Sequence, residues 1–313
     1  MKDELANSNE AQNAVEPAVN APASDAVISD AIISVRNLTV RFGERTIFQN
    51  VSYDVPRGKI FVILGGSGCG KSTMLRAMTG LVQPQQGQIL YNCALPPPRR
   101  TPQPAVHHPH TKSTIAANFN AAHGTASGDL VTSAGEERLR LLKNFGILFQ
   151  SGGLFASMTL AENIALPLTT DAKTASLSQE RLSDIVAMKL GAVGLSGFEA
   201  FLPSEISGGM KKRAGIARAM ALDPPILFFD EPSAGLDPVS SAALDNLIRE
   251  LNAALGTTMI VVTHELQSIE DIADYVIMLD RSAQGIIAKG TLAEVKSSSD
   301  KRVTNFFNRV SEN

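Results

Sequence analysis

The sequence predicts an α/β fold in which helices cover both faces of a parallel sheet. Short apolar runs of strand length alternate along the chain with helical stretches, as they do when parallel strands are joined by helical crossovers. One of these runs ends in a glycine-rich turn that leads directly into a helix. No internal repeat is visible, so one such unit is expected in the chain.

The predicted elements follow from these runs in order. Two strands, at residues 32–41 and 51–55, come first. Residues 59–64 form an apolar run that ends in glycines, which is typical of a strand buried on both faces. The next helix, at 72–80, closes with a glycine. The later elements are a helix at 209–221, a strand at 226–229, a helix at 240–255 and a strand at 259–262.

The composition restricts the class of protein. The chain has 313 residues, of which 44% are hydrophobic and 19% charged, so most of it can form a packed core. Its net charge of −3 argues against a nucleic-acid partner, which requires a basic surplus. Two cysteines exclude a disulfide scaffold and fit a reducing compartment. No apolar run approaches the roughly 18–20 residues that cross a bilayer, and the N-terminus lacks an apolar signal-peptide core, so we expect a soluble, cytoplasmic chain.

Two stretches differ in composition from the rest. Residues 1–30 hold six acidic side chains against one lysine and no aromatic residue, which predicts a disordered acidic tail. Residues from about 92 to 135 hold six prolines and four of the five histidines of the chain, which predicts a low-complexity insert. The catalytic domain is then expected at 31–292, followed at 293–313 by a linker and a short helix.

The strongest motif lies between the strand at 59–64 and the helix at 72–80. It matches G-x-x-x-x-G-K-[ST] and consists of Gly65, Gly66, Ser67, Gly68, Cys69, Gly70, Lys71, Ser72 and Thr73. Glycines let the backbone curl so that successive N–H groups point at phosphate oxygens, and the helix N-terminus adds partial positive charge. We expect Lys71 to reach the β- and γ-phosphates of a nucleotide and the Ser72 hydroxyl to ligate Mg²⁺.

Two adjacent carboxylates end the apolar strand at 226–229. Because side chains alternate along a strand, Asp230 and Glu231 are expected to point to different sides. This arrangement predicts that Asp230 serves Mg²⁺ and that Glu231 acts as a general base on an attacking water.

A third motif, Ser207-Gly208-Gly209, opens the helix that begins near residue 209. A hydroxyl, bare backbone N–H groups and a helix N-terminus can bind an anion, although the same residues can serve as a simple N-cap. The three cations that follow, at 211–213, are expected to be solvated or adjacent to phosphate.

These three motifs, in this order, resemble those of the ATP-binding subunits of ABC transporters. The resemblance covers residues 32 to about 290 and includes positions typical of that family. They are Phe42 (adenine stacking), Gln150 (Q-loop, serving both Mg²⁺ and catalysis), Asp237 (D-loop) and His264 (switch histidine). The family fold is a P-loop NTPase with a parallel core sheet, an antiparallel β subdomain and a helical signature subdomain.

The resemblance also implies a mechanism that needs two chains. ATP and Mg²⁺ would lie between the P-loop of one chain and the signature loop of another, so a homodimer is expected. Ser207 and Gly209 would contact the γ-phosphate that the other chain's Lys71 holds. Asp237 would line the dimer contact, and His264 would bind the γ-phosphate and orient the water. The motion would pass to an integral-membrane permease subunit through the region after Gln150.

Finer features resemble the ATPases of the Mla/Mce-type systems, which move phospholipids between the two membranes of Gram-negative bacteria. They lie at 150–155, at 157–159, at 162–168, at Met210 and at 300–307. This implies a position on the cytoplasmic face of the inner membrane. It also implies a permease, an MCE-domain substrate-binding protein and a small STAS-domain subunit as partners. The alternatives are the ATPase of an amino-acid or other small-solute importer and an ABC ATPase outside transport.

The C-terminal segment carries Val303, Phe306 and Phe307 at helical spacing. Such a stripe can pack on its own domain. Contact with a second copy or an accessory subunit is the interpretation we favour from the sequence.

Overall fold

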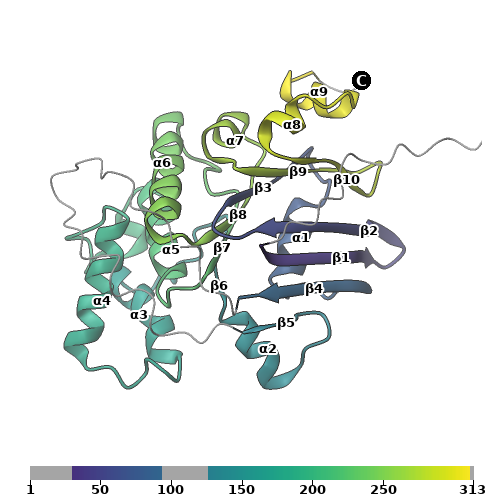
Figure 1. Ribbon diagram of the computed structural model, residues 1–313. Coiled ribbons are helices and arrows are strands. Elements are labelled where there is room, and N and C mark those ends of the chain that lie inside the picture. The colour runs from purple at the N-terminus through teal and green to yellow at the C-terminus, as the bar shows by residue number, and fades with distance from the viewer. Residues whose placement is uncertain (1–29, 94–125, 311–313) are drawn as a thin grey trace, which may run out of the picture.

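The computed structural model describes residues 30–93 and 126–310 (Figure 1). The predicted tail, apart from Asp30, and most of the predicted insert lie outside these residues. In the part that is described, a central sheet separates a mainly helical region from a second sheet.

The central sheet has the order β10-β9-β3-β8-β7-β6. Its strands are β3 (Ile60–Gly65), β6 (Phe145–Leu148), β7 (Ile226–Asp230), β8 (Thr258–Val262), β9 (Tyr275–Asp280) and β10 (Gly285–Gly290). All neighbouring pairs are parallel except β9 and β10, which form an antiparallel hairpin at one edge. Every residue of β3, β7 and β8 is buried, as their continuous apolar sequences predict.

The second sheet is antiparallel, with the order β2-β1-β4-β5. It consists of β1 (Ala31–Phe42), β2 (Arg45–Pro56), β4 (Gln86–Asn92) and β5 (Ser127–Asp129). Helix α1 (Lys71–Met78) buries Met74, Leu75 and Met78 in one apolar cluster with both sheets. The P-loop at the start of α1 is therefore anchored to the two sheets together.

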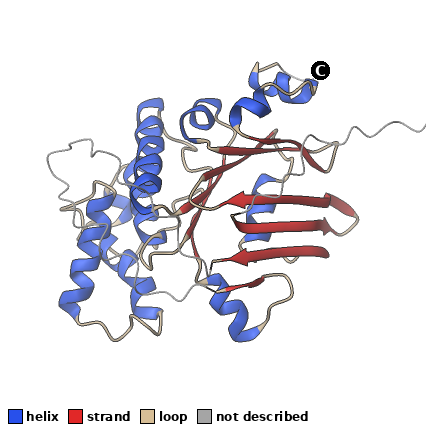
Figure 2. Cartoon of the chain, viewed as in Figure 1, coloured by secondary structure: helices blue, strands red, loops and turns tan. Residues whose placement is uncertain are grey.

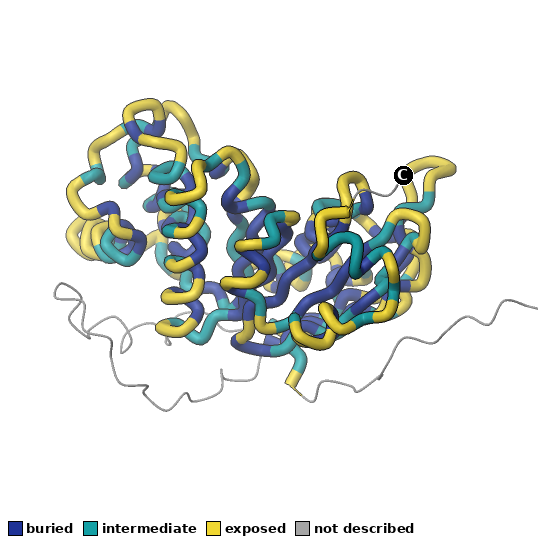
Figure 3. Tube along the Cα trace, turned by 90° about the horizontal axis from the view of Figure 1, so that it is seen from above, coloured by how far each residue is buried: buried dark blue, intermediate teal, exposed yellow. Residues whose placement is uncertain are grey.

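The helical region lies on the other side of the central sheet (Figure 2). It contains α3 (Leu160–Thr170), α4 (Gln179–Ala192) and α5 (Gly208–Ala219), and these helices share a second apolar cluster with α6 (Pro238–Leu255) and α7 (Leu266–Ile272). Buried stretches run through the interior of both parts, and exposed stretches form the rim (Figure 3). The expected fold class, with a parallel core, an antiparallel β subdomain and a helical subdomain, is confirmed. No helix in the described ranges is long and apolar enough to cross a membrane.

Two predicted boundaries differ from the structure. Strand β2 begins at Arg45 rather than at 51, because polar residues interrupt its first half and hide the strand pattern. The predicted insert at 92–135 overlaps Asn92 of β4 and all of β5. Leu130, after β5, is 1% exposed, and α2 (Gly135–Leu142) begins at the end of the predicted insert.

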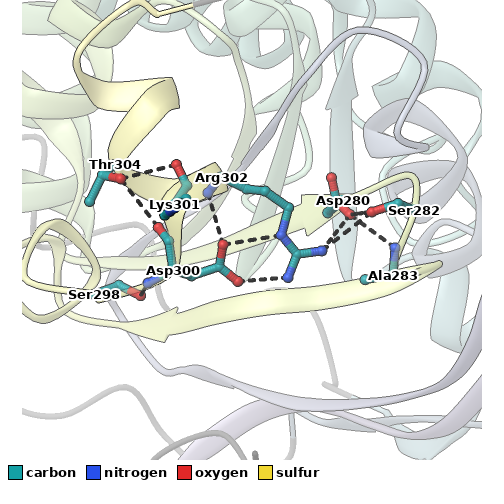
Figure 4. A network of polar contacts seen from close by, with 8 residues as sticks. All are labelled: Asp280, Ser282, Ala283, Ser298, Asp300, Lys301, Arg302 and Thr304. Atoms are coloured by element: carbon teal, nitrogen blue, oxygen red, sulfur yellow. Dashed lines mark hydrogen bonds and ion pairs between the residues drawn. The ribbon is translucent and has the colours of Figure 1, made fainter. Parts of the chain in front are cut away.

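The C-terminal segment packs on its own domain through Val303. The contact with a second copy or an accessory subunit, which we favoured from the sequence, is therefore wrong for this residue. Helix α8 (Leu292–Lys296) is followed by α9 (Lys301–Phe307), and Val303 is fully buried in the cluster of the helical region. Figure 4 shows how Arg302 holds α9 in place. Its guanidinium donates to Asp280 at the end of β9, at 2.9 Å, and to Asp300 at 2.6 Å.

Candidate active site

The P-loop occupies the turn from β3 to α1, and two of its glycines lie too close to neighbouring residues to carry a side chain. Gly65 has φ +147°, and a Cβ atom there would lie 2.3 Å from the carbonyl oxygen of Leu279. Gly70 has φ +104°, and a Cβ atom there would lie 2.5 Å from the ring of Phe48. The loop therefore follows the neighbouring strands closely, and α1 begins at Lys71 with its N-terminus toward the turn.

A pocket opens at this turn and collects most of the predicted site. Its lining consists of Gly65, Gly66, Ser67, Gly68, Gly70, Lys71, Ser72, Thr73, Glu231, His264 and Phe306. The P-loop and the residues that closely follow β7 and β8 thus meet, because the carboxyl ends of neighbouring parallel strands lie at one edge of the sheet. Phe306 comes from α9 and was not among the predicted site residues.

Lys71 is held inside the loop that it is expected to serve. Its residue is 9% exposed, and Nζ donates hydrogen bonds to the carbonyl oxygens of Gly65 at 2.9 Å and Gly66 at 3.1 Å. Its positive charge therefore lies at the floor of the pocket, where phosphate oxygens would meet it.

Ser72 and Asp230 come together across the strand ends. The Ser72 hydroxyl donates to Oδ1 of Asp230 at 3.0 Å, and Asp230 is 7% exposed. A hydroxyl and a carboxylate at this separation are hard oxygen ligands of the kind that Mg²⁺ prefers. The chemistry of this pair fits the metal that the sequence predicts.

Glu231 has a strained backbone and a defined side-chain partner. Its φ of +49° lies in the left-handed region, which costs a non-glycine residue about 1–3 kcal/mol. Its N–H donates to the carbonyl oxygen of Val262 at 2.9 Å, which helps to hold that conformation. Nδ1 of His264 lies 2.9 Å from both carboxylate oxygens of Glu231. Because a carboxylate only accepts hydrogen bonds, Nδ1 carries the hydrogen and Nε2 is left free to accept or donate.

Lys212 was expected to be solvated or adjacent to phosphate, but it is buried behind the site. It is 6% exposed, and Nζ donates to the backbone carbonyl oxygens of Gln150 at 2.5 Å and Glu231 at 3.3 Å. Burial lowers the pKa of its ammonium group, and the nearby carboxylates of Glu231, Asp230 and Glu265 oppose this shift. The helical period is the signal that could have identified it, because Lys212 shares a face of α5 with the buried Gly215 and Ile216.

The side of the loop near β2 forms a second, adjoining pocket. It is lined by Arg45, Thr46, Ile47, Cys69, Arg281 and Gln284. Cys69 is 3% exposed, and burial raises the pKa of its thiol. Phe42, which was expected to stack on adenine, ends β1 and is 50% exposed.

The signature and D-loop residues lie together but away from the P-loop pocket. The Ser207 hydroxyl accepts from the N–H of Met210 at 3.3 Å and so caps α5. A Cβ atom on Gly209 would lie 3.8 Å from Ser240 in the first turn of α6. Asp237 caps α6, and its hydrogen bonds from Ser240 and Val239 lower the pKa of its carboxyl group.

Gln150 follows β6 and is exposed, at the start of an exposed aromatic surface. Phe149 is 38% and Phe155 is 51% exposed. The guanidinium of Arg218 from α5 lies over the ring of Phe155, with 5.6 Å to its centroid, and also donates to the carbonyl oxygen of Gly153. The loop after β6 is thus fixed to α5 while its aromatic rings remain at the surface.

The sequence that forms most of this site matches one protein family over more than half of the chain. Residues 48–234 match the family described as "ABC transporter". The chain belongs to the ABC transporter family. It carries the ATP-binding, ATP-hydrolysing domain of that family, and the resemblance drawn from the motifs is confirmed.

Known relatives extend the likeness to most of the chain. The chain is 37% identical over 278 residues to the intermembrane phospholipid transport system ATP-binding protein MlaF of Haemophilus influenzae. These residues make up 89% of this chain and 90% of that protein. The chain is 36% identical over 280 residues to MlaF of Escherichia coli K12, with 89% of each chain covered. It is 38% identical over 247 residues to the probable ribonucleotide transport ATP-binding protein mkl of Mycobacterium leprae, with 79% of this chain and 60% of that one covered.

Solved structures agree with this membership. A dimeric post-hydrolysis state of the ATP-binding cassette MJ0796 bound to ADP and Pi superposes with a TM-score of 0.64 at 25% identity, covering 83% of this chain and 98% of that one. CbiO1 of Clostridium perfringens, part of the ABC transporter complex cbiONQ, superposes with a TM-score of 0.67 at 24% identity, covering 90% and 95%. The latter likeness establishes the fold alone.

Proposed function

We propose that this ATPase drives phospholipid transport between the inner and outer membranes of a bacterium and so maintains the lipid asymmetry of the outer membrane. The observation that carries the proposal is the 37% identity to MlaF of H. influenzae over 89% of this chain and 90% of that protein. This likeness spans 278 residues and so reaches well beyond the family core at 48–234.

Hydrolysis of ATP is assigned to the pocket at the P-loop. Lys71 and the backbone N–H groups of the loop bind the β- and γ-phosphates. Glu231 accepts a proton from the attacking water, and the Glu231–His264 contact of 2.9 Å keeps the carboxylate oriented. His264 then has Nε2 available for the γ-phosphate. The remaining P-loop residues and Phe42 hold the nucleotide.

Mg²⁺ is the metal proposed for this site. Ser72, Asp230 and Gln150 would hold it, and the 3.0 Å contact between Ser72 and Asp230 supports the first two. When bound, the ion neutralises charge on the phosphate oxygens. Gln150 is the remaining ligand in this proposal, which is supported by its position after β6, at the carboxyl edge of the same sheet.

A homodimer is proposed as the active unit. Gly208 lies beside Leu236 and Gly209 beside Ser240 of α6, and Ser207, Gly208 and Gly209 are not among the residues that line the pocket containing Lys71. This separation supports the proposal that another copy supplies them to the nucleotide. Asp237, at the start of α6, belongs to the same face. The dimeric state of the MJ0796 cassette, a likeness at 25% identity, supports this arrangement.

Partners in the membrane are proposed from the exposed aromatic surface after β6. Phe149 and Phe155 offer an apolar contact to an integral-membrane permease, next to the proposed Mg²⁺ ligand Gln150. By similarity to MlaF, we further propose an MCE-domain substrate-binding protein and a small STAS-domain subunit as companions, with this chain on the cytoplasmic face of the inner membrane.

The test is a tagged purification from detergent-solubilised membranes of the native host, with proteins and lipids identified by mass spectrometry. The proposal expects a permease, an MCE-domain protein and enriched phospholipid. A Phe155→Ser variant should lose the permease, whereas Leu139→Ser, on α2 and 59% exposed, should retain it as a matched control.

Ribonucleotide transport is the second candidate, because the mkl relative is 38% identical over 247 residues. Recovery of a solute permease without lipid enrichment would favour that class or another small-solute importer and would overturn the phospholipid proposal. The ATPase would be unaffected by that outcome.

A further inference from the structure

Lys212 connects three parts of the site without lining the pocket itself. It lies on α5, about one turn after Gly208 and Gly209. Its ammonium group reaches the ends of two strands of the central sheet, where it donates to the carbonyl oxygen of Gln150 at 2.5 Å and of Glu231 at 3.3 Å. The residue is 6% exposed, so water does not compete strongly for these hydrogen bonds.

The two carbonyl groups belong to residues whose side chains have assigned roles. Strands β6 and β7 are neighbours, with Leu148 opposite Phe229. Gln150 and Glu231 follow these strands by one or two residues, so their backbones lie side by side beyond the edge of the sheet. A single ammonium group with three donors can hold both.

The backbone of Glu231 depends on such support. Its φ of +49° is unfavourable for a residue with a side chain. The N–H of Glu231 donates to the carbonyl oxygen of Val262 in β8 at 2.9 Å. The carbonyl oxygen of Glu231 accepts from the N–H of Ala234 at 3.2 Å and from Lys212 at 3.3 Å. Without Lys212, the peptide group after Glu231 would keep only the local hydrogen bond from Ala234, and the strained conformation would lose its tie to α5.

We propose that Lys212 is a positioning residue for ATP hydrolysis, which fixes the backbones of Gln150 and Glu231 so that their side chains meet Mg²⁺ and the attacking water together. This inference rests on the roles proposed above for those two residues. Lys212 acts through them and makes no contact of its own with the nucleotide.

A second buried lysine provides a matched comparison. Lys189 on α4 is 0% exposed and forms an ion pair with Asp223, in the helical region and away from the strand ends. Both lysines are buried and hydrogen-bonded, so replacing either is expected to lower stability. Of the two lysines, only Lys212 contacts the proposed site residues. Only its replacement should therefore change the dependence of the ATPase activity on the Mg²⁺ concentration.

The experiment compares Lys212→Met, Lys212→Arg and Lys189→Met in the full chain, purified with its membrane partners. For Lys212→Met, kcat should fall about 10- to 100-fold, as for loss of a hydrogen bond from a charged donor. The Mg²⁺ concentration for half-maximal ATPase activity should rise about 3- to 10-fold, while the affinity for a fluorescent ATP analogue without Mg²⁺ should stay within about twofold. Lys212→Arg, which keeps the charge and the donors, should restore most of kcat. Lys189→Met should lower the melting temperature and leave the Mg²⁺ requirement unchanged.

Two outcomes would overturn the proposal. One is a folded Lys212→Met protein with wild-type kcat and Mg²⁺ requirement. The other is a loss of kcat matched by an equal loss of nucleotide binding without Mg²⁺ and not restored by Lys212→Arg, because that pattern indicates a purely structural lysine. If Lys212→Met does not fold, Lys212→Gln carries the test, since its shorter neutral side chain should give a smaller shift of the same kind.

Two reference variants separate this inference from the function on which it rests. Lys71→Ala should abolish ATP-dependent turnover, and Glu231→Gln should lower kcat about 100-fold or more, if the active site is assigned correctly. Turnover near wild type in these variants would remove the proposed function itself. Turnover lost in them but unchanged in Lys212→Met would remove only the role of Lys212.

Discussion

Replacing Asp245 with asparagine should stabilise the protein, and more so at alkaline than at acidic pH. Asp245 lies on α6 and is 3% exposed. The Ser268 hydroxyl of α7 donates to its Oδ2 at 2.7 Å, and Oδ1 is buried without a hydrogen bond. Burial raises the pKa of Asp245 from 3.8 to about 6 against the effect of that hydrogen bond, and the carboxylates of Glu265 and Asp271 raise it further.

The sign and size of the effect follow from this shift. A carboxyl group whose pKa is higher in the folded state contributes most to stability below its unfolded pKa and loses that contribution as pH rises through its folded pKa. The pKa of Asp245 is 3.8 in the unfolded chain and about 6 in the folded protein. Ionisation of Asp245 therefore lowers the free energy of unfolding by about 1.6 kcal/mol at pH 5 and by about 3 kcal/mol at pH 8. Asparagine carries no charge at either pH. The advantage of Asp245→Asn should therefore grow by about 1.4 kcal/mol, or roughly 3 °C in Tm, between pH 5 and pH 8.

Thermal unfolding followed by circular dichroism at both pH values, at one ionic strength, measures this difference. Asp184→Asn, at an exposed position of α4, controls for the change in net charge. Asp245→Ala removes the acceptor for Ser268 and isolates the hydrogen bond. An Asp245→Asn advantage that is equal at both pH values, or larger at pH 5, would refute the reasoning.

Three further predictions concern the active site and the chain between β4 and β5. Lys71→Ala should weaken ATP binding about 100-fold or more, because the pocket loses its buried cation. Titration with a fluorescent ATP analogue measures this affinity, and an unchanged affinity would exclude the P-loop assignment. Glu231→Gln should retain ATP binding but lower kcat about 10²- to 10⁴-fold. The variant should also accumulate as an ATP-bound dimer, which size-exclusion chromatography detects. Turnover near wild type would assign the general base to another residue. Replacing residues 94–125 with a short turn should preserve ATPase activity, because Asn92 already pairs with Ser127 and the hairpin can close there. Deleting 96–133 should instead abolish folding, since it removes β5 and the buried Leu130, and equal activity of the two deletions would contradict this.

The sequence was most informative where strands are buried on both faces. Strands β3, β7 and β8 were predicted because their residues are apolar without interruption. Strand β6 was not among the predicted elements, since it has four residues and includes Gly146, which has no side chain to mark the pattern. A Cβ atom on Gly146 would lie 2.0 Å from the carbonyl oxygen of Ala219, so this glycine is required by the close approach of α5. Such a requirement depends on tertiary packing and leaves no local signal.

For the active site, motifs predicted which residues meet but not what supports them. The P-loop, Glu231 and His264 line one pocket, as expected from residues that follow neighbouring parallel strands. Phe306 joins that pocket only because α9 folds back onto the domain, which spacing along the chain does not reveal. The sequence predicted a solvated or phosphate-adjacent Lys212, because three consecutive cations are usually in contact with solvent. The packing of α5 against β6 instead buries the middle one.

Helix α5 is the element through which the separate parts of the site are mechanically joined. Its first turn carries the signature residues, Lys212 holds the ends of β6 and β7, and Arg218 near its end holds the loop after β6 at Gly153. A Cβ atom on Gly215 would lie 2.5 Å from the carbonyl oxygen of Gly152, so the helix and this loop have no room to slide past each other. The span from Ser207 to Arg218 is only about 16 Å at 1.5 Å per residue. If the exposed aromatic surface is the membrane contact proposed above, its displacement would reach the signature loop through α5. Lys212 would then be the contact through which it reaches the ends of β6 and β7.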